Sequence, residues 1–465
     1  MTFRNYRNVH EMLKKTVEQH SDLDALKWFD PTGHVRSMTW TQYYDQVKSV
    51  ARSLMALGVV RGDKVAIISQ TCPQWVMVDL GCALVGACTV GIYPSNLPDD
   101  CRYILEHSDS VAVFVQDHLQ LAKVASVRDA LPKLQQIVSF SEAPSGDAED
   151  ALGFELFLEL GNTISQAQLT ARIESVGPGD VAGIIYTSGT TGVPKGAVLT
   201  HDKLTFTCQS VLKSGTFEPG DVTFLFLPLA HVFARTCFYT AIITGTTVCF
   251  LRSMETLGDE LRAARPHWFV SVPRIFEKIY DKINHQVETK GGVAFKLFKW
   301  ARRVGMAVSE CRIQGTPLPW TLKIQHRLAD TLIFSKIRGA FGGRVRWCIS
   351  GAAPLNPEIG KFFHACGILV LEGLGMTENT SFSNVNRPHN YRFGWVGPPG
   401  PGIEQSLAED GEILFRGRNV MREYYKMPQE TAAVLTSDGW LHSGDLGEID
   451  EENFLRVTGL SLIHI

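Results

Sequence analysis

The stretch YTSGTTGVPKG, residues 186–196, combines residue types whose spacing suits the binding of an anion. Its glycines let backbone N–H groups turn toward a phosphate and approach it closely. Lys195 adds a positive charge. Hydroxyl donors come from Thr187, Ser188, Thr190 and Thr191. We therefore expect a phosphate-binding loop, and the length of the run and its Pro-Lys-Gly ending disfavour the alternative of a plain turn between strands.

The loop does not match the two best-known glycine-rich nucleotide motifs. A Walker A loop needs a second glycine directly before the lysine, followed by Ser or Thr. Counted from Gly189, Pro194 stands at the second glycine's position and Gly196 follows the lysine. No GxGxxG opens a helix here either, so a P-loop NTPase and a Rossmann dehydrogenase are both disfavoured.

Short apolar runs that alternate with helix-like segments must position this loop. VAGII directly precedes it, and further strand-like runs are VAIIS, SVAVFV, QIVSF, VTFLFLPL, TTVCFL, HWFVSV, VRWCIS and GILVLE. A helix is expected after Thr39 or Thr41, with Gly58 as its stop. The pattern predicts an α/β fold with two parallel-sheet α/β subdomains, roughly 1–220 and 221–375, and a smaller β-rich subdomain over 376–459.

Composition restricts the class of protein. The chain has 465 residues, 45% of them hydrophobic and 20% charged, and a formal net charge of −3, so no global basicity points to nucleic acid. Ten cysteines include no CxxC pair, which argues against a zinc framework and favours a reducing compartment. The N-terminus lacks the apolar core of a signal peptide. We expect a cytoplasmic protein.

Two segments bear on membranes. Residues 74–94 are apolar but contain Asp79, and we expect a buried helix leading into a strand instead of a membrane span. Residues 290–346 are rich in Lys and Arg. That segment either faces lipid headgroups, giving peripheral membrane association, or is a solvated helical face, which is the favoured alternative.

Other motifs appear in a fixed order, and together they make the sequence recognisable. They are LPLAHVFAR (227–235), SVPRIFEKIYDKI (from Ser271), SGAAPL (350–355), LGMTENT (374–380) and SGDLGEID (443–450). With the first loop, they closely resemble the motifs of the adenylate-forming superfamily, and the second is similar to long-chain acyl-CoA synthetases. The resemblance covers residues 10–459 and implies the family's large N-terminal domain over 1–459.

The resemblance implies that a fatty acid carboxylate attacks the α-phosphorus of ATP, and that coenzyme A then displaces AMP. The implied phosphate-binding residues are Thr187, Ser188, Gly189, Thr190, Thr191, Gly192 and Lys195. Those implied around the adenine and α-phosphate are Gly351, Ala352, Ala353, Leu374, Gly375, Met376 and Thr377. Asp445 is implied to accept from the ribose hydroxyls.

The implied catalytic residues are Lys195, Thr377 and Glu378. Glu378 is implied to bind Mg²⁺, a hard cation suited to carboxylate and phosphate oxygens, and Thr187 is a weaker candidate for the same ion. His231 and Arg235 are implied to flank the acyl pocket, with Arg235 as a gate. The apolar runs around them suit a greasy acyl group. No obligate protein partner is implied.

The sequence departs from the family pattern in two places. Leu374 stands where the family usually has an aromatic residue that stacks on adenine. Residues 460–465, LSLIHI, stand where the family has its hinge, and we expect the family's small C-terminal domain to be missing. These six residues match the translation of a sequencing adaptor, so we expect a non-native tail; a genuinely truncated protein is the alternative.

We interpret the chain as most of a long-chain fatty acid–CoA ligase with ATP, Mg²⁺ and coenzyme A as cofactor and co-substrates. As a fragment, it should bind ATP and make little thioester. Two rival functions stay open. One is activation of another carboxylic acid, aryl or amino, and the other is a non-catalytic nucleotide- or lipid-binding form.

Overall fold

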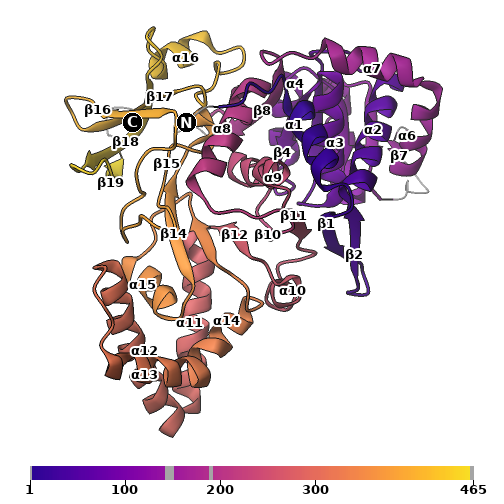
Figure 1. Cartoon of the computed structure of the whole chain (residues 1–465). Coiled ribbons are helices and arrows are strands. Elements are labelled where there is room, and N and C mark those ends of the chain that lie inside the picture. The colour runs from indigo at the N-terminus through magenta and orange to yellow at the C-terminus, as the bar shows by residue number, and fades with distance from the viewer. Residues whose placement is uncertain (1–2, 142–150, 188–191, 461–465) are drawn as a thin grey trace.

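The computed structural model describes residues 3–141, 151–187 and 192–460 and contains three sheets (Figure 1). The first is seven-stranded, in the order β7-β6-β5-β3-β4-β8-β9, and parallel except for the β8–β9 pair. Its strands are β3 (Lys64–Ile68), β4 (Cys88–Ile92), β5 (Ser110–Val115), β6 (Gln136–Ser139), β7 (Ala151–Gly153), β8 (Val181–Thr187) and β9 (Lys195–Thr200).

The second sheet is eight-stranded, in the order β15-β14-β13-β12-β10-β11-β1-β2, with antiparallel strands at both edges. Its strands are β1 (Asp24–Phe29), β2 (Val35–Thr39), β10 (Val222–Leu225), β11 (Thr247–Phe250), β12 (Trp268–Ser271), β13 (Trp347–Ser350), β14 (Leu369–Leu374) and β15 (Asn384–Val385). The third sheet is small and antiparallel, with β16 (Ile403–Leu407), β17 (Glu412–Gly417), β18 (Leu441–Ile449) and β19 (Leu455–Leu460).

Helices cover both faces of the two large sheets. They are α1 (Val9–His20), α2 (Trp40–Ala56), α3 (Pro73–Val85), α4 (Pro98–His107), α5 (His118–Ser126), α6 (Phe154–Leu160), α7 (Gln166–Ser175), α8 (His201–Ser214), α9 (Val232–Thr244), α10 (Leu257–Ala264), α11 (Pro273–Lys290), α12 (Gly292–Ile313), α13 (Trp320–Ala329), α14 (Ser335–Ala340), α15 (Pro357–Ala365) and α16 (Pro428–Val434). Single turns are η1 (Arg128–Ala130), η2 (Gly161–Thr163), η3 (Asp330–Phe334) and η4 (Thr377–Asn379).

The three largest hydrophobic cores fix this arrangement. The largest joins the facing sides of the two big sheets through α1, α2, α3 and α9. A second core lies under α4 and α5 on the outer face of the seven-stranded sheet. The third lies on the outer face of the eight-stranded sheet, under α11, α12 and α15, where helices α11–α14 form a lobe at the bottom of Figure 1.

The predicted fold class is confirmed, and each of the eight strand-like runs that flank VAGII in the chain contains a strand. Residues 74–94 form most of α3 followed by β4, as expected, and Thr39 caps α2 through a hydrogen bond from the Gln42 N–H. Strands β1 and β2 belong to the eight-stranded sheet although they precede residue 220, and no sequence pattern indicated that pairing. The subdomain boundaries remain a prediction.

Candidate nucleotide and acyl site

The predicted phosphate loop connects β8 to β9. These strands pair in register so that Thr187, the last residue of β8, lies opposite Lys195, the first residue of β9. Gly192 has a φ of +88°, a conformation that L side chains rarely adopt, and a Cβ on it would meet no neighbouring atom. A substitution there would therefore strain the backbone without causing a clash. Ser188, Gly189, Thr190 and Thr191 lie outside the described residues.

Lys195 and Glu378 meet through a tyrosine that the sequence analysis missed. The ammonium of Lys195 lies 5.6 Å from the centre of the Tyr424 ring and forms an ion pair with Glu430 of α16. The Tyr424 hydroxyl donates a 2.6 Å hydrogen bond to Glu378 Oε1. Burial and the adjacent Glu378 raise the pKa of Tyr424, so the phenol remains protonated and is held as a donor.

The segment that carries Tyr424 is fixed by backbone pairing to both sides of the site. The Tyr425 N–H donates to the Gly196 carbonyl at 2.8 Å, and the Met421 N–H donates to the Glu378 carbonyl at 2.6 Å. Because β9 and η4 are both tied to residues 421–425, the lysine and the glutamate keep a fixed relation. Their partners lie far away in the sequence, so no local pattern marked Tyr424 or Glu430 in advance.

The turn that follows β14 brings Thr377 and Glu378 into the interior. Both residues are buried in η4. Gly375 allows this turn, since a Cβ on it would overlap the Ser381 carbonyl and come within 2.7 Å of the Phe382 nitrogen. Ser381 itself has a φ of +65°, a strained conformation for a non-glycine residue. The turn is therefore strained, and the packing of the buried residues around it stabilises the strained backbone.

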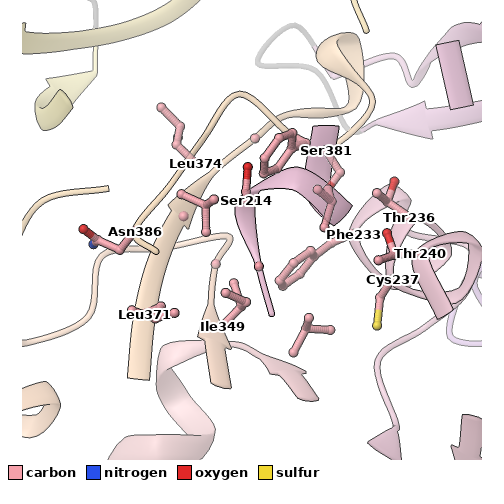
Figure 2. Close-up of a pocket in the computed structure, with 18 of the residues that line it drawn as sticks. Ser214, Phe233, Thr236, Cys237, Thr240, Ile349, Leu371, Leu374, Ser381 and Asn386 are labelled. Atoms are coloured by element: carbon pink, nitrogen blue, oxygen red, sulfur yellow. The ribbon is translucent and has the colours of Figure 1, made fainter. Parts of the chain in front are cut away.

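An apolar pocket opens beside this turn (Figure 2). Figure 2 labels Phe233, Thr236, Cys237 and Thr240 from α9, Ile349 and Leu371 from the large sheet, and Leu374, Ser381 and Asn386 around the turn, with Ser214. Four of the residues predicted for the adenine also line it: Gly351, Ala352, Leu374 and Gly375. A Cβ on Gly351 would lie 3.1 Å from the Phe233 ring, so the glycine brings strand and helix close together. Ala353, Met376 and Thr377 do not belong to its wall.

His231 lines the pocket at the start of α9. Its Nδ1 accepts a 3.1 Å hydrogen bond from the Phe233 N–H and so caps the helix. Burial lowers the pKa of His231, which favours the neutral ring. With Nδ1 as an acceptor, the neutral imidazole carries its proton on Nε2.

Arg235 lies against α3, outside the pocket wall. It is 2% exposed, is not part of the pocket wall, and forms an ion pair with Asp79 of α3, which is fully buried. The Tyr239 hydroxyl donates to the other Asp79 oxygen at 2.7 Å. Arg235 follows the N-cap His231 by four residues, but its side chain pairs with α3 and does not line the pocket. In this structure Arg235 belongs to the α3–α9 interface, and its gate role stays a prediction.

Asp445 lies in β18 of the small sheet, outside the pocket wall. It is partly buried, and burial together with the neighbouring Glu412 raises the pKa of its carboxyl. No described residue donates a hydrogen bond to its carboxylate, whereas its own N–H donates to Ser443 Oγ at 3.1 Å. A partly buried carboxylate without a donor is suited to accept from a ligand hydroxyl. The small sheet is joined to the pocket by Leu374, which packs against its apolar side.

The described residues include no cluster of three or more His, Cys, Asp or Glu side chains that could hold a metal ion by themselves. Glu378 Oε1 is engaged by Tyr424, and no described residue donates to Oε2. Mg²⁺ commonly binds one or two carboxylates together with substrate phosphate oxygens. The residues therefore fit an ion that binds together with a polyphosphate.

The fold and this site define the class of protein. The AMP-binding enzyme family model matches residues 13–425, and the chain belongs to that family. It is 34% identical over 427 residues to the long-chain-fatty-acid–CoA ligase FadD15 of Mycobacterium bovis, an alignment that covers 91% of this chain and 69% of the relative. It is 32% identical to the long-chain-fatty-acid–CoA ligase ACSBG2 of Gallus gallus, over 97% of this chain and 61% of the relative. The chain thus spans about two thirds of these relatives.

Solved structures support the fold alone. The inhibitor-bound N-terminal domain of FACL13 from Mycobacterium tuberculosis aligns with a TM-score of 0.70 and 21% identity, over 98% of this chain and all of that one. The anthranilate CoA ligase AuaEII in complex with anthranoyl-AMP aligns with a TM-score of 0.75 and 22% identity, over 98% of this chain and 79% of that one.

Proposed function

We propose that the chain binds ATP and a long-chain fatty acid and, within the whole protein, makes acyl-AMP and then acyl-CoA. The observation that carries this proposal is the linked set Lys195, Tyr424 and Glu378. Lys195 begins β9, directly after a loop whose sequence is rich in glycine and hydroxyl groups, and Tyr424 and Glu378 lie beside it. An apolar pocket opens beside the turn that carries Glu378. The names of the relatives at 31–34% identity support the acyl substrate.

In the first step, an oxygen of the fatty acid carboxylate attacks the α-phosphorus of ATP, and the bond to the bridging oxygen of pyrophosphate breaks. Both reactants are anions, so the site must supply positive charge and oriented donors. Lys195 and the hairpin loop, residues 187–192, would hold the terminal phosphates. Thr377 would donate to the α-phosphate or to the carboxylate.

Glu378 would hold Mg²⁺ through its free oxygen, with Thr187 as a weaker ligand, and the ion would neutralise phosphate charge when bound. Tyr424 would keep the Glu378 carboxylate oriented. Asp445 would accept hydrogen bonds from the ribose. In the second step, the sulfur of coenzyme A attacks the acyl carbonyl, loses its proton and displaces AMP.

The Lys195–Glu430 ion pair suggests how Lys195 is held in position before ATP binds. An ammonium beside a polyphosphate site needs a counter-charge before the ligand arrives, and Glu430 supplies it. ATP binding would exchange one anion for another at Lys195. The ion pair would therefore hold the Lys195 side chain in position before ATP binds, but the Glu430 carboxylate would compete with the phosphates for it.

The pocket would bind the part of the acyl chain nearest the carboxylate. The Nε2–H of His231 would face the polar end of the fatty acid. Gly351, Ala352 and Leu374 are shared between this wall and the predicted adenine contact, so adenine and acyl group would meet there. Leu374 can pack on the adenine ring without the stacking of an aromatic residue.

ATP–pyrophosphate exchange across a panel of acids tests the proposal. We expect exchange with palmitate to exceed that with benzoate, anthranilate or free amino acids. A preference for an aryl or amino acid would replace the fatty acid as substrate. No exchange with any acid by the folded whole protein would contradict acid activation.

A further inference from the structure

Helix α13 and the η3 turn that continues it carry a row of large apolar side chains that are exposed to solvent. Trp320, Ile324, Leu328 and Leu332 follow one another at intervals of four residues, and they are 73%, 53%, 53% and 42% exposed. Residues four apart lie on one face of a helix. Single exposed apolar residues need no explanation, but a continuous row of four that begins with a tryptophan indicates an interaction surface.

The exposed row is not the face by which α13 packs on the rest of the protein. The opposite face of α13 and η3 supplies its own buried residues, Ala329 and Phe334, which pack into the core under α12. Helix α13 lies at the far end of the helical lobe, away from the small sheet and the chain termini (Figure 1). The apolar row is therefore an additional surface on a helix that is already anchored.

The surroundings of the row are strongly basic. Residues 290–346 contain twelve Lys and Arg and two Asp and Glu, a formal charge of +10 in a chain whose total is −3. Lys323, Arg327 and Lys336 flank the row, are exposed, and form no ion pair with any described residue. Beside them, a shallow pocket is lined by Arg312, His326, Arg327, Asp330, Arg338 and Gly367. Its charge is therefore positive as well.

We propose that the row on α13 docks this protein on an anionic lipid bilayer. Trp320 would lie at the level of the headgroups, and the aliphatic side chains would enter the boundary of the acyl region. Lys323, Arg327 and Lys336 would lie against lipid phosphates. The described residues include no helix long and apolar enough to cross a membrane, so docking by this surface is peripheral.

The charge pattern favours a bilayer over other occupants. In a two-fold dimer each lobe would face its own copy, which would bring two copies of this basic segment together. A nucleic acid would be attracted by the charge but would gain little from Ile324, Leu328 and Leu332, which cannot pair with or stack on bases. An anionic membrane matches both the apolar row and its basic flanks. This inference goes beyond the proposed function and does not rest on it.

Co-sedimentation with sucrose-loaded vesicles tests it. We expect the protein to bind vesicles of phosphatidylcholine mixed with phosphatidylglycerol, to bind pure phosphatidylcholine much less, and to dissociate as salt is raised. Lys323→Gln combined with Arg327→Gln and Lys336→Gln should weaken binding to anionic vesicles about a hundredfold, at about 1 kcal/mol per charge and 1.4 kcal/mol per tenfold change.

Trp320→Ser with Leu328→Ser should also weaken binding, whereas Leu97→Ser with Leu119→Ser should not. The control pair is 69% and 60% exposed and lies at α4 and α5, far from the lobe. Equal binding by the row variant and the control would overturn the proposal, as would equal binding to neutral and anionic vesicles. Light scattering closes the remaining alternative: a wild-type dimer that the row variant makes monomeric would assign the row to a contact between copies.

Discussion

The buried ion pair between Asp79 and Arg235 gives a sharp test of how α9 is built. Asp79→Asn keeps the size of the side chain and removes its charge. Asp79 is fully buried and Arg235 is 2% exposed, so the guanidinium would be left without a counter-charge and without water. Tyr239 could still donate to the amide oxygen, so the lost stability would come from the charge. Breaking a buried pair in this way costs about 3–5 kcal/mol.

Urea unfolding of the wild type and the variant measures this cost, with the slope of the transition as a check that the same surface unfolds. The double variant Asp79→Leu/Arg235→Met should recover most of the loss, since apolar replacements of buried pairs are often neutral. Glu18→Gln, in an exposed pair with Lys14, is the control and should change stability by less than about 0.5 kcal/mol. A loss below about 1 kcal/mol for Asp79→Asn would refute the structural assignment of Arg235.

Three further predictions concern the turn, the lysine and acidic pH. Gly375→Ala should destabilise the fold by about 1–3 kcal/mol in urea unfolding because its Cβ meets backbone, whereas Gly258→Ala, which has open space, should not; equal effects would contradict the packing argument. Glu430→Gln should tighten ATP binding up to about fivefold in calorimetry, since it removes a partly exposed competitor of the phosphates for Lys195, and weaker binding would count against that exchange. Burial lowers the pKa of His364 to about 4 from 6.5, so the unfolded chain takes up this proton first and stability falls as pH drops from about 6.5 to 4, by about 1.4 kcal/mol per pH unit. His364→Gln should remove that share of the slope in urea unfolding at a series of pH values, and an unchanged slope would contradict it.

Much of the fold could be predicted from the sequence because parallel strands buried on both faces appear as continuous apolar runs. SVAVFV and VRWCIS are examples, and both contain strands at the expected places. Strands β1 and β2 gave no such signal. Strand β2 is an antiparallel edge with exposed residues, and β11, the parallel partner of β1, follows more than two hundred residues later. Neither periodicity nor turn chemistry therefore assigned β1 and β2 to that sheet.

The parts of the candidate site that lie within one short motif could be predicted from the sequence. The parts that depend on contacts between distant segments could not. The loop that ends at Lys195 is a single short segment, and its glycine and hydroxyl residues are recognisable in the sequence as a phosphate-binding pattern. Tyr424 and Glu430 reach the lysine only through the pairing of residues 421–425 beside β9. The gate role of Arg235 came from the family resemblance alone, and its buried pair with Asp79, 156 residues away, is a tertiary contact that no local pattern marks.

Calorimetric titration of ATP with Mg²⁺ into this chain tests the central claim most directly. We predict that the folded protein binds ATP and that Lys195→Ala weakens the binding about tenfold or more, since a charge-assisted hydrogen bond contributes about 1.5–3 kcal/mol. Lys203→Ala, a lysine of α8 outside the site, should bind as the wild type does. A folded protein that takes up no ATP, or a Lys195→Ala variant that binds it unchanged, would contradict the account.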